Sequence, residues 1–98
     1  MNRRLVVRPE AKEDIAKAYG WYWERGENLG RDFLEELGSL FRTIEAYPHA
    51  FPKVHGEKRR ALLKRFPWAV FYRLPADEIL ILAVFHQACD PRRWKILR

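Results

Sequence analysis

The sequence predicts a single α+β domain over residues 1–98, in which a hairpin of two helices packs on one face of a mainly antiparallel sheet. Three observations lead to this prediction. Apolar residues recur with helical spacing through the first half of the chain, and the apolar period changes to two near residue 58. The connections between the last three predicted strands are short, which makes neighbouring strands antiparallel. Helices grouped ahead of a run of strands favour an α+β fold over a wound parallel sheet.

The first elements are a short strand and a helix. Arg3–Val7 is predicted to be a strand, and Pro9 suits the first turn of a helix, where its missing N–H is not needed. Gly26 is expected to end this helix. Its apolar face follows the helical period and consists of Ala11, Ile15, Ala18, Tyr19 and Tyr22.

A second helix follows directly. Asn28 is expected to cap its N-terminus, and Pro48 closes it, because the residue before a proline is pushed out of the helical region. Its apolar stripe, widened by two neighbours, consists of Phe33, Leu34, Leu37, Leu40, Phe41, Ile44 and Tyr47. A connection of about three residues folds the two helices into an antiparallel hairpin.

The remaining chain is predicted to form three strands after a loop at residues 48–58. The strands are Arg60–Phe66, Trp68–Leu74 and Ile79–His86, followed by a tail from Pro91. In the middle strand one face carries Val70, Tyr72 and Leu74, and the other carries Ala69, Phe71 and Arg73. The last strand is apolar on both faces. It is therefore expected to be central and covered on both sides, or covered on one side and reserved for a partner.

The net charge of +6 is concentrated in the second half of the chain. Residues 53–98 contain 11 Lys and Arg against 4 Asp and Glu, whereas residues 1–52 contain 8 against 9. This asymmetry indicates a surface that attracts phosphate or an acidic protein segment. The alternative is a basic surface that is merely solvated.

Several functional classes are excluded by composition. Cys89 is the only cysteine, so an intrachain disulfide and a cysteine metal cluster are impossible, and a reducing cytoplasm is expected. The three histidines lack metal-ligand spacing, and no glycine loop suited to phosphates occurs, so no metal and no cofactor are expected. No stretch is long and apolar enough to cross a membrane.

The order of the elements resembles the ParE/RelE toxin family, and the ending is closer to the ParE branch. The resemblance runs from about Leu5 to Trp94, and its most similar parts are Arg59–Arg73, Ala83–His86 and Asp90–Trp94. It implies a bacterial type II toxin that is neutralised by a co-expressed antitoxin. ParE members are associated with poisoning DNA gyrase, and RelE members with cutting mRNA on the ribosome.

The two activities require different residues. RNA cleavage needs proton carriers and cations, for which Arg65, Arg73 and His86 are the candidates. RelE-type nucleases usually carry a Tyr or His near the C-terminus, where this chain has Trp94, and an indole cannot shuttle protons. We therefore expect a toxin that binds gyrase without chemistry of its own. The alternatives are a ribosome-dependent mRNA endonuclease and a non-toxic interaction module.

The residues expected to bind a partner all have aromatic or basic side chains. They are Trp21, Trp23, Arg60, Lys64, Arg65, His86, Arg92, Arg93 and Trp94. Trp21 and Trp23 flank Tyr22, and three consecutive helical aromatics cannot all face the core. Either one of the two tryptophans packs near Phe51, or they form an apolar patch for an antitoxin helix or a second copy of the chain.

His86 is the one predicted strand histidine, and two roles are open for it. Strict alternation places it on the face of Leu80, Leu82 and Val84. It serves either a structural role, hydrogen-bonded at a strand end beside Asp90, or a direct functional one. A homodimer or a toxin–antitoxin hetero-oligomer is expected.

Overall fold

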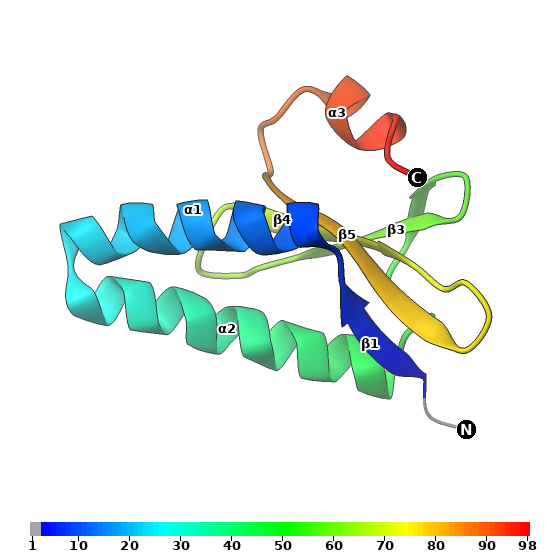
Figure 1. Ribbon diagram of the computed structural model, residues 1–98, viewed down its shortest axis with the longest axis horizontal. Coiled ribbons are helices and arrows are strands. Elements are labelled where there is room, and N and C mark those ends of the chain that lie inside the picture. The colour runs from blue at the N-terminus through cyan, green and yellow to red at the C-terminus, as the bar shows by residue number, and fades with distance from the viewer. Residues whose placement is uncertain (1–2) are drawn as a thin grey trace.

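The computed structural model describes residues 3–98, and residues 1 and 2 of the expected domain lie outside this range (Figure 1). The elements are β1 (Arg4–Val7), α1 (Pro9–Arg25), α2 (Glu27–Ala46), β2 (Lys53–His55), β3 (Lys58–Leu62), β4 (Trp68–Arg73), β5 (Glu78–His86) and α3 (Pro91–Lys95). The α+β class and the strand, helical hairpin and antiparallel strands are confirmed.

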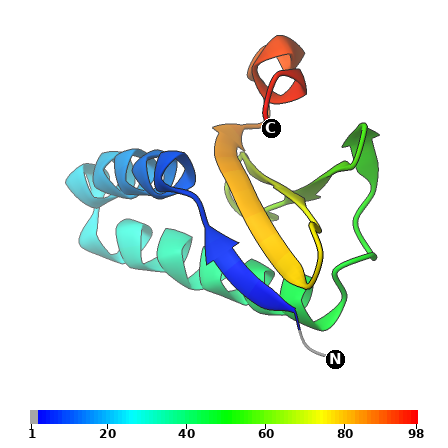
Figure 2. The same cartoon turned by 45° about the vertical axis from the view of Figure 1, so that its right-hand side comes forward.

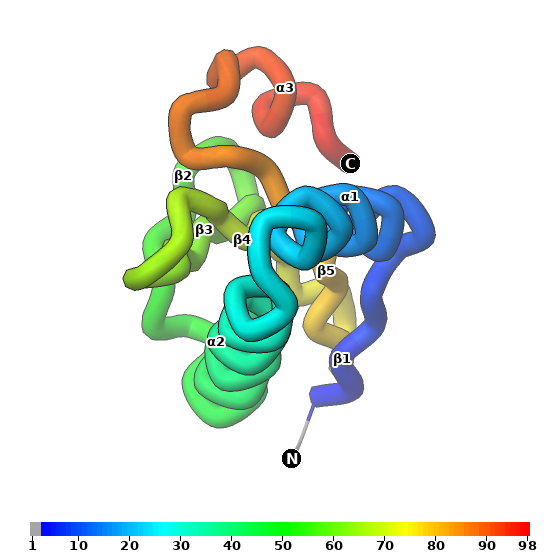
Figure 3. The backbone as a smooth tube through the Cα atoms, turned by 90° about the vertical axis from the view of Figure 1, so that its left-hand side faces the viewer, coloured from blue at the N-terminus to red at the C-terminus, as the bar shows by residue number. Residues whose placement is uncertain are grey.

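The five strands form one sheet in the order β1-β5-β4-β3-β2. β1 runs parallel to β5, and the other neighbouring pairs are antiparallel. Figure 3 shows this order behind the two helices, with β1 and β2 on opposite sides. The apolar β5 lies next to the middle of the sheet and is buried from Ile79 to Phe85 apart from the half-buried Leu80, so the prediction of a covered central strand is confirmed.

The face of the sheet toward the hairpin carries the larger core. α1 contributes Ala11, Ala18 and Tyr22, and α2 contributes its predicted stripe from Phe33 to Ile44. Two members of the predicted stripe are exposed, Leu34 to 41% and Tyr47 to 66%. Tyr47 follows the end of α2 with φ at −137°, so helical spacing no longer sets the direction of its side chain.

The opposite face of the sheet is covered by the C-terminal segment, which the sequence left as a tail. Figure 2 shows α3 beyond the end of β5, apart from the helical hairpin. Its Trp94 stacks on Phe71 of β4 with ring centroids 5.5 Å apart. Asp90 caps α3 by accepting the N–H of Arg92 at 3.0 Å, and Pro91 occupies the first helical position.

Three predicted boundaries are wrong. Gly26 alone joins the helices, because its N–H bonds to carbonyls of α1 and its carbonyl accepts the N–H of Gly30, so Asn28 lies inside α2 and is no cap. The expected loop at 48–58 contains β2, and β3 ends at Leu62 instead of continuing to Phe66. The reason is that Glu36 of α2 accepts the backbone N–H groups of residues 64 and 65, which removes them from the ladder.

A β-bulge interrupts β5. Phe71 pairs with Ala83, whereas the next residue, Tyr72, pairs with Ile81, which leaves Leu82 as the extra residue. Leu82 and Ala83 therefore both face the C-terminal segment, and Val84 faces the helices. Every side chain beyond the bulge lies on the face opposite to the one that strict alternation predicts.

Candidate functional site

An apolar groove opens where α1 passes the ends of β4 and β5. Its volume is about 490 Å³. We call it the aromatic groove, and its lining consists of Lys17, Ala18, Trp21, Tyr22, Pro67, Trp68 and His86. Only Trp21 and His86 among these were predicted as partner-binding residues.

The floor of the aromatic groove is fixed by packing and by a hydrogen bond. The indole N–H of Trp68 donates to the Tyr22 hydroxyl at 2.9 Å. The ring of Tyr22 lies edge-on against that of Phe66, with centroids 4.9 Å apart, and the centroid of the Phe33 ring is 5.2 Å away. These rings come from α1, α2 and the β3–β4 connection, so the floor holds the hairpin to the sheet and is rigid.

The two flanking tryptophans are exposed, as expected for an apolar patch. Trp21 is 51% exposed, and the Arg25 guanidinium carbon lies 3.4 Å from its ring centroid. Trp23 is 42% exposed and packs on Tyr19 and on Gly30 of α2. The alternative packing near Phe51 is wrong, because the ring of Phe51 packs edge-on against Tyr72 instead.

His86 lies on the other sheet face from the one predicted. The bulge turns it toward the hairpin with Val84, away from Leu80 and Leu82. Its ring packs edge-on against Trp68, with centroids 5.5 Å apart.

The hydrogen bonding of His86 also differs from the prediction. Its Nδ1 accepts the N–H of Ala88 at 3.0 Å, which leaves the ring hydrogen on Nε2. Asp90 instead bonds to Arg92, and this bond lowers the pKa of the Asp90 carboxyl. His86 is thus hydrogen-bonded at the strand end, but its partner is a backbone N–H.

The predicted basic residues do not form a single surface. Arg65 pairs with Asp32 of α2 at 3.2 Å, and Arg92 pairs with Asp90 at 2.6 Å. The guanidinium carbon of Arg93 lies over the ring of Phe85, 4.3 Å from its centroid.

Arg60 and Trp94 lie together on the outer sheet face. The guanidinium carbon of Arg60 is 5.9 Å from the Trp94 ring centroid. Both line a small hollow of about 200 Å³, which His86 and Gln87 also reach. His86 therefore borders both this hollow and the aromatic groove.

The three candidate nuclease residues are not brought together. His86 pairs with Trp68 at one end of β4, and Arg73 pairs with Leu80 at the other end. These two positions of β4 are five residue steps apart, about 17 Å at the usual rise. Arg65 is engaged with Asp32, away from Arg73.

Lys17 and Trp68 line the groove but were missed by the sequence analysis. Lys17 lies one position before a buried residue of the predicted stripe, so it had to lie at the edge of that stripe. Trp68 faces His86 across the β4–β5 ladder. A register for these two strands would have placed them together, but the sequence pattern did not specify one.

Comparison with known proteins shows the family to which the chain belongs. The family model described as the ParE toxin of the type II toxin–antitoxin system parDE matches residues 5–91. The chain belongs to the ParE toxin family. Toxin ParE2 of Mycobacterium tuberculosis, from two strains, is 30% identical over 96 residues, covering 93% of this chain and 88% of that protein.

A solved structure supports the ParE fold. The chromosomal ParDE toxin–antitoxin system from P. aeruginosa matches with a TM-score of 0.76 at 18% identity, covering 86% of this chain and 95% of that one. None of the helices within residues 3–98 is long and apolar enough to span a membrane. Over the same range, no three His, Cys, Asp or Glu side chains converge on a possible metal site.

Proposed function

We propose that this ParE-family toxin inhibits DNA gyrase by binding it, with the aromatic groove as the contact surface. The observation that carries the proposal is the half-exposed Trp21 beside the fixed Tyr22–Trp68 floor. Exposed aromatic side chains over a rigid apolar floor are typical of protein interfaces, where Trp and Tyr supply much of the binding energy. A rigid floor also reduces the entropy lost on binding.

The groove is better suited to binding than to catalysis. Among the described residues that line it, His86 is the one side chain that ordinarily exchanges protons near neutral pH. Its Nδ1 is already occupied by the N–H of Ala88. General acid–base cleavage of RNA requires a second proton carrier within reach.

An antitoxin segment is expected to occupy the same groove. Antitoxin tails of the acidic, amphipathic kind fold on binding and present apolar anchors along one helical face. Trp21 and Trp68 offer the apolar contact area, and Lys17 and Arg25 lie where acidic side chains of such a helix would pair. Binding of the antitoxin then excludes gyrase. The outer residues Arg60, Arg92, Arg93 and Trp94, with Lys64 and Arg65, remain candidates for further partner contacts, in a toxin–antitoxin hetero-oligomer or a homodimer.

The direct experiment is supercoiling of relaxed plasmid by purified gyrase with increasing amounts of the purified toxin. We expect supercoiling to be lost as the toxin approaches saturation, and to return when a cognate antitoxin is added. Unimpeded supercoiling at saturating toxin would contradict the proposal. Harmless overexpression in a host with a sensitive gyrase would favour the non-toxic interaction module instead.

The second candidate function is ribosome-dependent cleavage of mRNA. The observation that favours it is the position of His86 beside Arg60 in the outer hollow. In that case the His86→Ala variant keeps its fold and loses toxicity, and cut transcripts disappear from cells that express it. If gyrase is the target, transcripts stay uncut both in cells that express the parent protein and in cells that express the variant.

A further inference from the structure

A second pocket lies at the opposite end of β4 from the aromatic groove. Its volume is about 320 Å³, and it lies between the turn after β4, the loop before β2 and the β2–β3 hairpin. We call it the basic pocket. The charged and titratable residues of its lining are Arg3, His49, Lys53, Glu57, Arg59 and Arg73. Four cations face one carboxylate, so the lining has a net charge of +3 with His49 neutral.

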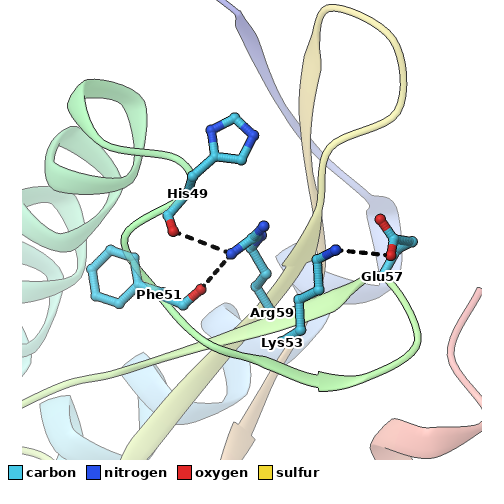
Figure 4. Close-up of polar contacts among 5 residues, drawn as sticks. All are labelled: His49, Phe51, Lys53, Glu57 and Arg59. Carbon is cyan, nitrogen blue, oxygen red and sulfur yellow. Dashed lines mark hydrogen bonds and ion pairs between the residues drawn. The ribbon is translucent and has the colours of Figure 1, made fainter.

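The three arginines are held in place by main-chain oxygens. Nη1 of Arg59 donates to the carbonyls of His49 and Phe51 at 3.2 and 2.7 Å (Figure 4). Nη1 of Arg3 donates to the carbonyls of residues 76 and 78, and Nε of Arg73 donates to a main-chain oxygen of the last residue, Arg98, at 2.9 Å. A peptide carbonyl orients a guanidinium without neutralising it, so the positive charges of Arg3 and Arg59 remain.

This arrangement differs from that of four arginines outside the pocket. Arg4, Arg31, Arg65 and Arg92 each pair with a carboxylate. Arg8 and Arg25 donate to main-chain oxygens, as the pocket arginines do, but they lie outside the pocket. Within residues 3–98, no ion pair of 4.0 Å or less joins an arginine of the basic pocket to an Asp or Glu side chain. The pocket's carboxylate, Glu57, pairs with Lys53 at 3.0 Å, at the exposed rim of the pocket (Figure 4).

The wall of the pocket is rigid. The Tyr72 hydroxyl donates to the Pro48 carbonyl at 2.7 Å, and the ring of Phe51 packs edge-on against the Tyr72 ring. Burial raises the pKa of Tyr72 to about 12, so this hydroxyl keeps its proton and the bond persists at neutral pH. Together with the two bonds from Arg59, this bond fixes the loop before β2. The donors that remain free on the guanidiniums are therefore pre-positioned.

The lining favours phosphate over an acidic peptide. Guanidinium groups match the oxygens of a phosphate with paired N–H donors. An acidic amphipathic segment would also need apolar anchor sites, and the apolar part of the described lining consists of Leu74 and Pro75. We propose that the basic pocket is a phosphate site that binds the backbone of a nucleic acid. The proposal does not depend on gyrase inhibition, because the pocket lies away from the aromatic groove.

The test is fluorescence anisotropy of a labelled DNA duplex over a series of NaCl concentrations. The double variant Lys53→Gln/Arg73→Gln is compared with Lys12→Gln/Arg42→Gln, which removes the same charge from exposed positions on α1 and α2. We expect the pocket variant to bind about tenfold more weakly at low salt, with a salt slope smaller by about 2. We expect the control to stay within about twofold of the parent protein.

A third variant protects the test against a folding defect. Glu57→Gln removes the one carboxylate of the pocket without touching an arginine, and is expected to tighten DNA binding. Equal loss of affinity in the pocket and control double variants, or unchanged binding by Glu57→Gln, would overturn the proposal. Displacement of DNA by polyglutamate at equal charge would assign the pocket to an acidic peptide instead. Binding of inorganic phosphate without DNA binding would overturn the nucleic-acid assignment.

Discussion

Asp14 of α1 completes the sheet where β1 ends. β1 pairs with β5 as far as Ile81, and beyond that point the edge of β5 lacks a neighbouring strand. The Asp14 carboxylate accepts the N–H of Val84 there at 3.0 Å, directly after the bulge. Partial burial raises the pKa of Asp14 above its ordinary value of 3.8, and the bond from Val84 and the charge of Arg93 oppose this rise.

This raised pKa predicts a pH dependence of stability. A folded-state pKa above the unfolded one means that the folded protein binds more protons in that interval, so the free energy of unfolding falls as pH rises through it. Asp14→Asn keeps an oxygen acceptor for Val84 and has no charge to titrate. We therefore expect the variant to gain stability relative to the parent protein as pH rises above 3.8, and the difference to level off above the folded-state pKa.

Urea unfolding of both proteins from about pH 3.5 to about pH 7 measures this difference. The Asp14→Ala variant serves as a control, because it removes the acceptor and is expected to cost about 1 kcal/mol or more in addition. Parallel stability curves for Asp14→Asn and the parent protein would contradict the role assigned to this carboxylate.

At the scale of elements, the helical hairpin depends on one close contact. A Cβ added at Gly30 of α2 would lie 3.2 Å from Cα and 3.3 Å from Cβ of Trp23 in α1. Because a backbone atom is involved, the two helices would have to separate. We predict that Gly30→Ala lowers the free energy of unfolding by about 1–3 kcal/mol.

Gly20 provides the matched control for this substitution. It lies inside α1, and an added Cβ there has no neighbour within 4 Å. Gly20→Ala is therefore expected to raise the free energy of unfolding by about 0.5–1 kcal/mol, through helix propensity alone. Thermal or urea unfolding of both variants measures these two changes in the free energy of unfolding. Changes of the same sign in both variants would contradict the close contact at Gly30.

The helices and strands that could be predicted are those with an apolar period of their own. The stripes of α1 and α2 and the two faces of β4 follow from spacing, and the structure has them. The end of β3 could not be predicted, because it depends on Glu36, a residue distant in sequence that binds the chain after Leu62. β2 was missed because its three residues after Pro52 are too few to show an apolar period.

The candidate site was partly predictable for the same physical reason. Trp21 and Trp23 could be placed on the flanks of α1, because helical geometry requires it. The sheet face on which His86 lies could not be predicted, because one bulged residue reverses the face of every later side chain in the strand. The meeting of His86 with Trp68 and Trp21 depends on strand register and on how α1 crosses the sheet, which are tertiary features.

At the scale of the whole molecule, the ParE fold separates three kinds of surface. The aromatic groove lies at one end of β4, the basic pocket lies at the other, and the C-terminal segment covers the outer sheet face between them. The positive charge of the second half of the chain is therefore divided among several places. Changes at the aromatic groove are expected to affect partner binding, and changes at the basic pocket to affect phosphate binding, with little coupling between them.

The most direct test of the account is gyrase supercoiling with groove variants of the toxin. Trp21→Ser removes the exposed aromatic wall of the groove, and Tyr47→Ser removes a still more exposed aromatic residue outside it. We predict that about tenfold more of the Trp21 variant is needed for the same inhibition, as for loss of an interface hot spot, and that the Tyr47 variant acts like the parent toxin. Equal inhibition by the parent toxin and both variants would contradict a gyrase contact at the aromatic groove.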